Sequence, residues 1–178
     1  PEGAAAMAGA MEGIEELDLG NNALRDVGAK WVARALKDNT SLRRLNLAAN
    51  DIGGDGAWWV ADALGHNGEL RWLDLGSNAV GDAGAKDLAE DLRANTALHT
   101  LDLRRNGVGH EGAAELAEAL QHNATLTSVI LRGNAVPEQG AREIRAKAGL
   151  RMDVEFQSLQ SSSSSSSQRG GGGGGGGG

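Results

Sequence analysis

The sequence predicts an α/β solenoid in which a short strand and a helix alternate along the chain. Apolar residues return every 28 positions in two columns, and asparagine keeps the same period in a third. A fixed period between 20 and 50 residues indicates stacked copies of one structural unit. The three columns are Leu17, Leu45, Leu73, Leu101 and Val129; Leu19, Leu47, Leu75, Leu103 and Leu131; and Asn22, Asn50, Asn78, Asn106 and Asn134.

Each unit has a strand half and a helix half. In the third unit, Leu73 and Leu75 flank Asp74, the apolar–polar alternation of a strand with one buried face. Residues 84–92 follow, and their apolar positions fall at i, i+3, i+4 and i+7, which predicts one buried face of a helix. Each unit is therefore a strand, a turn, a helix and a return loop.

Polar residues are predicted to cap these helices. Asp26 and Asp82 precede the helical runs, where an N-cap belongs. Asparagine tolerates the left-handed conformation that commonly ends a helix. We therefore expect C-caps at the asparagines that follow the helices, namely Asn39, Asn67, Asn95 and Asn123.

Stacking such units produces a curved array. Parallel strands lie about 4.8 Å apart, whereas helices need about 10 Å each. The mismatch predicts a right-handed arc, with the strands on the concave side and the helices on the convex side.

The repeat resembles a known family. Residues 70–80 read Leu-x-x-Leu-x-Leu-x-x-Asn-x-Val, which fits the leucine-rich-repeat signature. A 28-residue period with a full helix is similar to the ribonuclease-inhibitor class, which includes the repeat domains of NOD-like receptors and of the Ran GTPase-activating protein. The resemblance covers residues 1–156. The chain has no cysteine, unlike the cysteine-rich mammalian ribonuclease inhibitor.

The two ends depart from the repeat. Residues 3–11 match a helix half without its strand, which indicates a piece of a longer array or a chain whose first methionine was removed before Pro1. An uncapped, apolar first helix predicts self-association. At the other end, residues 152–156 are predicted to close the sheet, about three residues early, with Phe156 pointing inward. Residues 157–178 are Ser- and Gly-rich and are predicted to be a disordered tail.

Composition excludes several functions. A net charge of −7 argues against nucleic-acid binding, and no apolar run reaches membrane length. The lack of cysteine favours the cytoplasm. His66 and His122 share a repeat position but lie two repeats apart, too far to hold one metal ion. No catalytic set or nucleotide-binding motif is present, so we expect no catalysis, cofactor or metal.

The asparagine column invites two interpretations. A column of polar side chains could bind a ligand, but buried asparagines at tight turns more often satisfy backbone groups. We therefore interpret Asn22, Asn50, Asn78, Asn106 and Asn134 as a structural ladder.

The concave face carries the candidate binding residues. Residues flanking the central leucine of each strand point away from the core. The first strand is acidic, the turns after the fourth and fifth are basic, and Trp72 lies between them as the predicted anchor. The candidate residues are Glu16, Asp18, Arg44, Asn46, Trp72, Asp74, Asp102, Arg104, Arg105 and Arg132. The alternative for Asp74 and Asp102 is that they only keep the sheet soluble.

The other three tryptophans fall on the helices. Trp31 and Trp59 share a repeat position and are predicted to pack between neighbouring helices. Trp58 follows Lys30 in its column, so we expect it to be more exposed and to mark a second contact surface on the convex side.

These observations favour a protein-binding module that uses its concave face. Two alternatives follow from the family resemblance. One is a regulator of a small GTPase, although the Ran GTPase-activating protein carries an acidic tail where this chain has Ser and Gly. The other is a sensor fragment of NOD-like receptor type.

Overall fold

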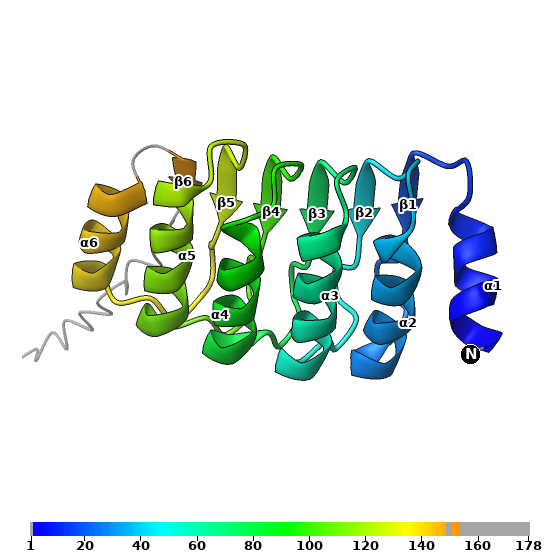
Figure 1. Ribbon diagram of the computed structural model, residues 1–178. Helices are drawn as coiled ribbons and strands as arrows, with labels where there is room; N and C mark the ends of the chain where they lie inside the picture. Colours follow the sequence, from blue (N-terminus) through cyan, green and yellow to red (C-terminus); the bar gives the residue numbers. More distant parts are fainter. Residues whose placement is uncertain (1, 149–150, 154–178) are drawn as a thin grey trace, which may run out of the picture.

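Helices and strands alternate along the chain (Figure 1). The computed structural model describes residues 2–148 and 151–153. Its elements are α1 (Glu2–Met11), β1 (Glu16–Asp18), α2 (Arg25–Lys37), β2 (Arg44–Asn46), α3 (Gly54–His66), β3 (Trp72–Asp74), α4 (Gly81–Leu92), β4 (Thr100–Asp102), α5 (His110–His122), β5 (Ser128–Ile130), α6 (Glu138–Ala148) and β6 (Met152–Asp153).

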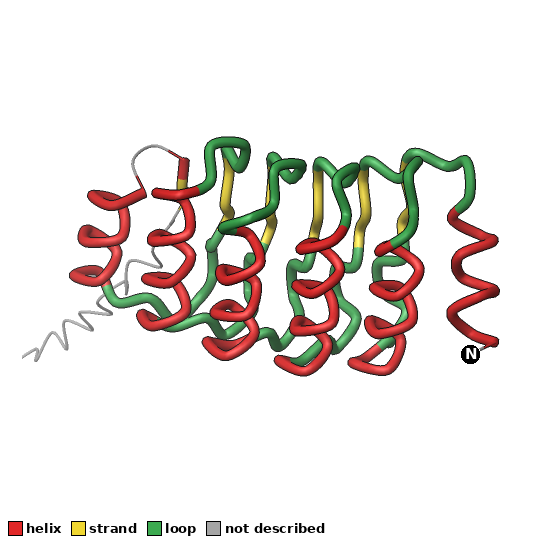
Figure 2. Tube along the Cα trace, in the orientation of Figure 1, coloured by secondary structure: helices red, strands yellow, loops and turns green. Residues whose placement is uncertain are grey.

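The strands form one parallel sheet in sequence order, from β1 to β6. Leu17 pairs with Leu45, and Leu45 pairs with Leu73, so the register from β1 to β5 advances by one 28-residue unit per strand. The helices form a second layer on one side of the sheet (Figure 2). The fold is an α/β leucine-rich-repeat solenoid, as predicted, with its strands on the concave face.

Leucines from the strands and small residues from the helices fill the core between the two layers. The central strand residues from Leu45 to Val129 are buried, and so are the residues two positions further on, from Leu47 to Leu131. Leu17 and Leu19 are only partly buried, since β1 is the edge strand of the described sheet. Within the described residues, none of the helices combines the length and apolar character that crossing a membrane requires.

The first asparagine column links successive turns. The Asn78 side-chain oxygen accepts from the backbone N–H groups of Asn50, at 2.9 Å, and Ile52, at 3.0 Å. The Asn78 amide nitrogen donates to the carbonyls of Leu47, at 3.0 Å, and Leu75, at 2.8 Å. Asn50 and Asn134 each bond their neighbouring turns in the same way. One side chain therefore satisfies polar backbone groups in two repeats.

The asparagines after the helices form a second ladder instead of left-handed caps. Asn67 and Asn123 have φ values of −87° and −95° with extended ψ, so the expected left-handed conformation is wrong for both. Asn67 and Asn123 are also almost fully buried. The Asn67 amide nitrogen donates to the carbonyls of Leu36 and Asn39 in the preceding repeat, and its oxygen accepts from the N–H of Leu70.

Arg151 occupies the position 28 residues after Asn123 and continues this second ladder. Its guanidinium donates to the carbonyl of Asn123 at 2.8 Å and to that of Leu120, the partners that an asparagine would have there. The repeat period therefore holds through residue 151.

The closing strand lies closer to the last helix than predicted. Met152 pairs with Val129, a step of 23 residues, so β6 comes five residues early instead of three. Arg151 keeps its repeat position, so the missing residues are those that follow it. In the preceding repeat, five residues separate Asn123 from the paired strand residue Val129, whereas Met152 follows Arg151 directly. The predicted inward position of Phe156 and the tail over residues 157–178 lie outside the described residues.

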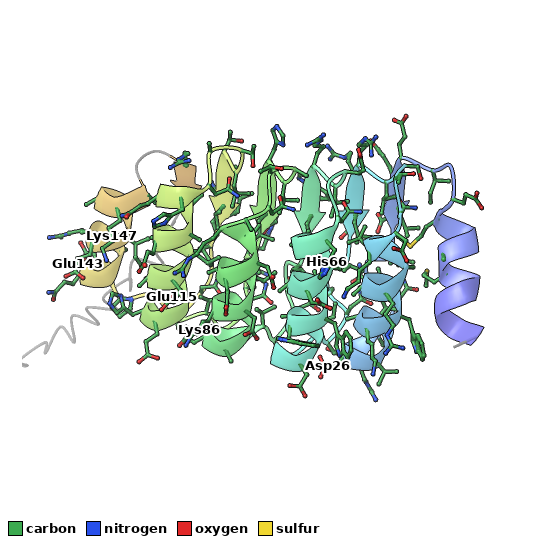
Figure 3. The ribbon with its side chains drawn as sticks, in the orientation of Figure 1. Asp26, His66, Lys86, Glu115, Glu143 and Lys147 are labelled. Atoms are coloured by element: carbon green, nitrogen blue, oxygen red, sulfur yellow. The ribbon has the colours of Figure 1, made fainter. Side chains whose placement is uncertain are left out.

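The two aspartates predicted as N-caps act on the next helix instead of their own. Asp26 lies inside α2, whose N-cap residue makes no side-chain capping bond. Its carboxylate oxygen accepts from the N–H groups of Gly53, at 2.7 Å, and Gly56, at 3.0 Å, at the start of α3. Figure 3 places Asp26 between the starts of α2 and α3. Asp82 bonds the start of α5 in the same way.

Candidate functional site

The side chains of the last strand residues, which form the predicted acidic column together with Asn46, hydrogen-bond the turns that follow the strands. In four successive strands, the last residue accepts a hydrogen bond from the backbone N–H two positions further on. The bonds run from Gly20 to Asp18 at 2.8 Å, Ala48 to Asn46 at 2.9 Å, Gly76 to Asp74 at 2.6 Å and Arg104 to Asp102 at 3.0 Å. This shared bond gives the column a structural role beside any role in binding.

We predicted Asp102 as an exposed residue of the concave face, but its side chain is buried. Only 1% of Asp102 is exposed, because the Arg104 side chain covers it. The Arg104 guanidinium donates to the second carboxylate oxygen through Nε at 2.8 Å and through a terminal nitrogen. The hydrogen bond to Asp102 also raises the pKa of Arg104. The charges of Asp102 and Arg104, which belong to the predicted acidic and basic parts of the face, therefore neutralise each other.

Asp74 lies beside this pair and is half-buried. Burial raises the pKa of the Asp74 carboxyl, which the bond from Gly76 opposes, and the negative charges of Asp102 and Asp18 raise it further. The positive charge of Arg104 lowers it in part. Ionised Asp74 is therefore held at an energetic cost.

Trp72 is partly covered by Arg44 from the neighbouring strand. The Arg44 guanidinium lies over the indole, 4.6 Å from the ring centroid. Trp72 is therefore half-buried. Arg44 also lies 3.5 Å from a carboxylate oxygen of Glu16. Three predicted site residues on neighbouring strands are therefore in contact: Arg44 on β2 meets Glu16 on β1 and Trp72 on β3.

A hollow opens beside Trp72, with a volume of about 560 Å³, lined by Arg44, Arg71, Trp72, His99 and Thr100. Arg71 donates to the carbonyl of Ala97 at 2.9 Å. His99 Nδ1 lies 2.7 Å from the same carbonyl, and since a carbonyl only accepts, Nδ1 carries the proton. Nε2 is then the imidazole nitrogen left for a ligand. Every ionisable side chain in this lining is basic.

Sequence reasoning missed Arg71 and His99. They belong to the column one residue before each strand, which reads Glu15, Arg43, Arg71, His99 and Thr127. The column holds no apolar residue, and this was the signal that it faces outward.

The structure separates the remaining basic candidates from this hollow. Arg105 and Arg132 follow β4 and β5, whereas Arg71 and His99 precede β3 and β4. The Arg105 N–H donates to the carbonyl of Arg132 at 2.8 Å, so these two turns are neighbours. The concave face therefore has basic groups at both strand ends. Within the described residues, no cluster of His, Cys, Asp and Glu is arranged to hold a metal ion.

Comparison with known proteins agrees with this architecture. The family described as Leucine Rich repeat matches residues 14–33, 38–57, 69–89 and 94–117, so the chain carries leucine-rich repeats. A search of curated proteins found no match.

Solved structures that share the fold include two that bear on its function class. One is described as Leiomodin-1 Actin-Binding Site 2, with a TM-score of 0.70 and 21% identity, covering 83% of this chain and 85% of that chain. The other is the tropomodulin C-terminal domain of Caenorhabditis elegans, with a TM-score of 0.67 and 12% identity, covering 82% of this chain and 90% of that chain. At these identities the similarity concerns the fold alone.

Proposed function

We propose that this chain is a cytoplasmic protein-binding module without catalysis of its own, and that its partner docks on the concave face. The hollow beside Trp72 is the observation that supports this most directly. It combines an aromatic ring with Arg44, Arg71 and His99, and tryptophan and arginine are enriched in binding hot spots. An acidic group of the partner fits the guanidinium groups of Arg44 and Arg71 in this lining, and the indole supplies the apolar contact.

The rest of the concave face orients the partner. Glu16 and Asp18 lie on β1 and attract a basic segment, while Arg105 and Arg132 beyond β4 and β5 attract an acidic one. Such complementarity mainly speeds association and sets orientation. Asp102 no longer belongs to this surface, because Arg104 covers it.

The fold similarity to leiomodin and the resemblance to the ribonuclease-inhibitor class suggest which partners to test. The leiomodin structure is described as an actin-binding site, so actin is the first purified protein to test. The resemblance to the ribonuclease-inhibitor class keeps two alternatives, a regulator of a small GTPase and a sensor fragment of NOD-like receptor type. A small GTPase is therefore the second protein to test.

The experiment compares one concave and one convex variant. Capture from a cytosolic lysate, and cosedimentation with actin filaments, are measured for wild type, Trp72→Ala and Trp58→Ala. We expect Trp72→Ala to weaken binding of a captured partner by about 2 kcal/mol, or roughly 30-fold in Kd, while Trp58→Ala still captures that partner. Equal capture by wild type and Trp72→Ala would place the surface elsewhere.

Arg105→Glu tests the steering charges. It should lower the association rate and its dependence on salt, with little change in the dissociation rate. Arg104→Glu is unsuitable for this purpose, since it would leave the buried Asp102 carboxylate without its partner. An unchanged association rate in Arg105→Glu would remove the turns after β4 and β5 from the proposed surface.

A further inference from the structure

The convex side carries exposed large apolar side chains on the neighbouring helices α2 and α3. Among the described residues, the large hydrophobic residues that are exposed are Val27, at 67%, and Trp58, at 47%. Val27 lies in the first turn of α2, and Trp58 lies on the adjacent α3. We call the surface they form with Lys30, Trp31, Arg34 and Trp59 the convex tryptophan patch.

Cations and indoles alternate within this patch. The Lys30 amine lies 4.5 Å from the ring centroid of Trp59. The Arg34 guanidinium lies 5.2 Å from the same ring and 5.5 Å from that of Trp31. The indoles of Trp58 and Trp59 meet edge to face, 4.7 Å apart. These contacts hold the rings in place, so a ligand would meet a preformed surface.

The other repeats show that the scaffold does not need these residues. At 28-residue steps, Val27 is followed by Asp55, Ala83, Glu111 and Gln139, and Trp58 is followed by Lys86, Ala114 and Arg142. Trp31 and Trp59 are followed by Asp87, Glu115 and Glu143. Figure 3 shows Lys86, Glu115 and Glu143 on the helix layer of the later repeats. Trp59 also packs against the core, but the charged residues at its position in the later repeats show that the repeat does not require a tryptophan there, and no core packing accounts for the exposed Trp58.

The charge of the patch also departs from the rest of the chain. The chain carries a net charge of −7, yet the basic residues of α2 outnumber its one acid, Asp26, which bonds the start of α3. The basic residues of α2 are Arg25, Lys30, Arg34 and Lys37. The equivalent surface of α4 and α5 is acidic, with Asp87, Glu90 and Glu118. The adjacent α3 adds the acids Asp55 and Asp62, and Asp62 pairs with Lys37. The basic groups that favour an acidic ligand are therefore Lys30 and Arg34, which lie among the indoles.

We propose that the convex tryptophan patch binds an acidic amphipathic helix of a partner protein. Neighbouring helices in the array are about 10 Å apart, so one added helix can lie along α2 and α3. Its apolar stripe covers Val27 and Trp58, with anchors spaced at i, i+3, i+4 and i+7. Its carboxylates reach Lys30 and Arg34. An anionic membrane fits less well, because its broader surface would also approach the acidic α4.

The test uses synthetic peptides of known charge. The probe is a tryptophan-free helical peptide of about 18 residues, with a leucine stripe flanked by glutamates; matched peptides carry glutamine or lysine in place of glutamate. Binding is measured by titration calorimetry and by the tryptophan emission of the protein. We expect wild type to bind the glutamate peptide at least about tenfold more tightly than the lysine peptide.

Variants borrowed from the other repeats keep the fold intact. Val27→Ala with Trp58→Ala places alanines where the later repeats have Ala83 and Ala114, and it should weaken the glutamate peptide at least about tenfold. Arg34→Glu, the residue found at Glu90, should remove the preference for the glutamate peptide. The concave variant Trp72→Ala should bind the peptide like wild type, which separates this surface from the proposed function. Circular dichroism melts confirm that each variant is folded.

Four outcomes would overturn the proposal. Equal binding of the glutamate and lysine peptides would show that charge does not select the ligand. Unchanged binding in the double alanine variant would move the site away from α2 and α3. Binding to phosphatidylserine vesicles that requires Trp58, without peptide binding, would make the ligand a lipid surface. Sedimentation showing self-association that requires Trp58 would make the occupant a second copy of the chain.

Discussion

Replacing Asn78 by alanine should destabilise the fold far more than the same change at Asn22. The Asn78 oxygen accepts from the N–H groups of Asn50 and Ile52, and both of these residues are fully buried. Asn78→Ala leaves these two donors without a partner. A buried unsatisfied group costs about 1–3 kcal/mol, so the expected loss is about 2–6 kcal/mol. This is a large share of the roughly 5–15 kcal/mol that stabilises a typical domain.

Asn22 is the matched control because it begins the column. Its side-chain nitrogen donates to the carbonyls of Leu19 and Gly20, and both bonds are exposed to solvent. Water can replace these bonds, so Asn22→Ala should cost less than about 1 kcal/mol. Both variants remove the same atoms from the same repeat position, and only the inter-repeat bonds and the burial differ.

The assay is denaturation in guanidinium chloride, followed by circular dichroism and tryptophan fluorescence. Hydrogen exchange adds a local readout, since the amides of Asn50 and Ile52 should lose protection in Asn78→Ala. Similar losses for the two variants, or retained protection of these amides, would refute the assignment of Asn78 as a buried link between repeats.

Three further predictions concern charge, capping and assembly. Burial raises the Asp74 pKa above its ordinary 3.8, so stability falls as pH rises through the folded-state pKa. Asp74→Asn, which mimics Asn46, should therefore be more resistant to denaturant than wild type at pH 7. The difference in stability between the two proteins should close toward pH 3.8. Asp26→Ala should cost about 0.5–2 kcal/mol by removing the cap of α3; a control, exposed Asp55→Ala, should melt near wild type, and equal melting of the two variants would contradict the cap. Self-association through the α1 end predicts that sedimentation shifts with concentration, and a monomer at high concentration would argue against it.

The periodic residues were enough to predict most of the fold. Leu73 and Leu75 occupy inward positions because their column repeats in every unit, and each unit must bury the same face against its neighbours. The strand positions and the register from β1 to β5 followed from that period alone. Where the period breaks, prediction failed in detail, as at Met152, which pairs five residues early. Here the long side chain of Arg151 takes an asparagine position, and no periodic signal marks the shortening.

The candidate site was predictable only as a surface. The alternation in each strand placed Trp72 and Arg44 on the concave face, but not the stacking of one upon the other, which depends on the register between strands. His99 and Arg71 lie outside the strands, where the period-two rule no longer applies. Their convergence on the carbonyl of Ala97 depends on the path of the loop.

The sequence by itself determined a solenoid of strand–helix units, its two layers and the residues between them, because one hydrophobic pattern repeated every 28 residues has only one efficient way to stack. Tertiary structure alone decided which polar side chains remain available. Asp102 looks like Asp74 in the sequence, yet Arg104 folds over it and buries it. Asp26 looks like a cap for its own helix, yet it bonds the next one. The physical reason is the same in both cases: a polar group bonds the partner nearest in space, and the repeat period does not specify that partner.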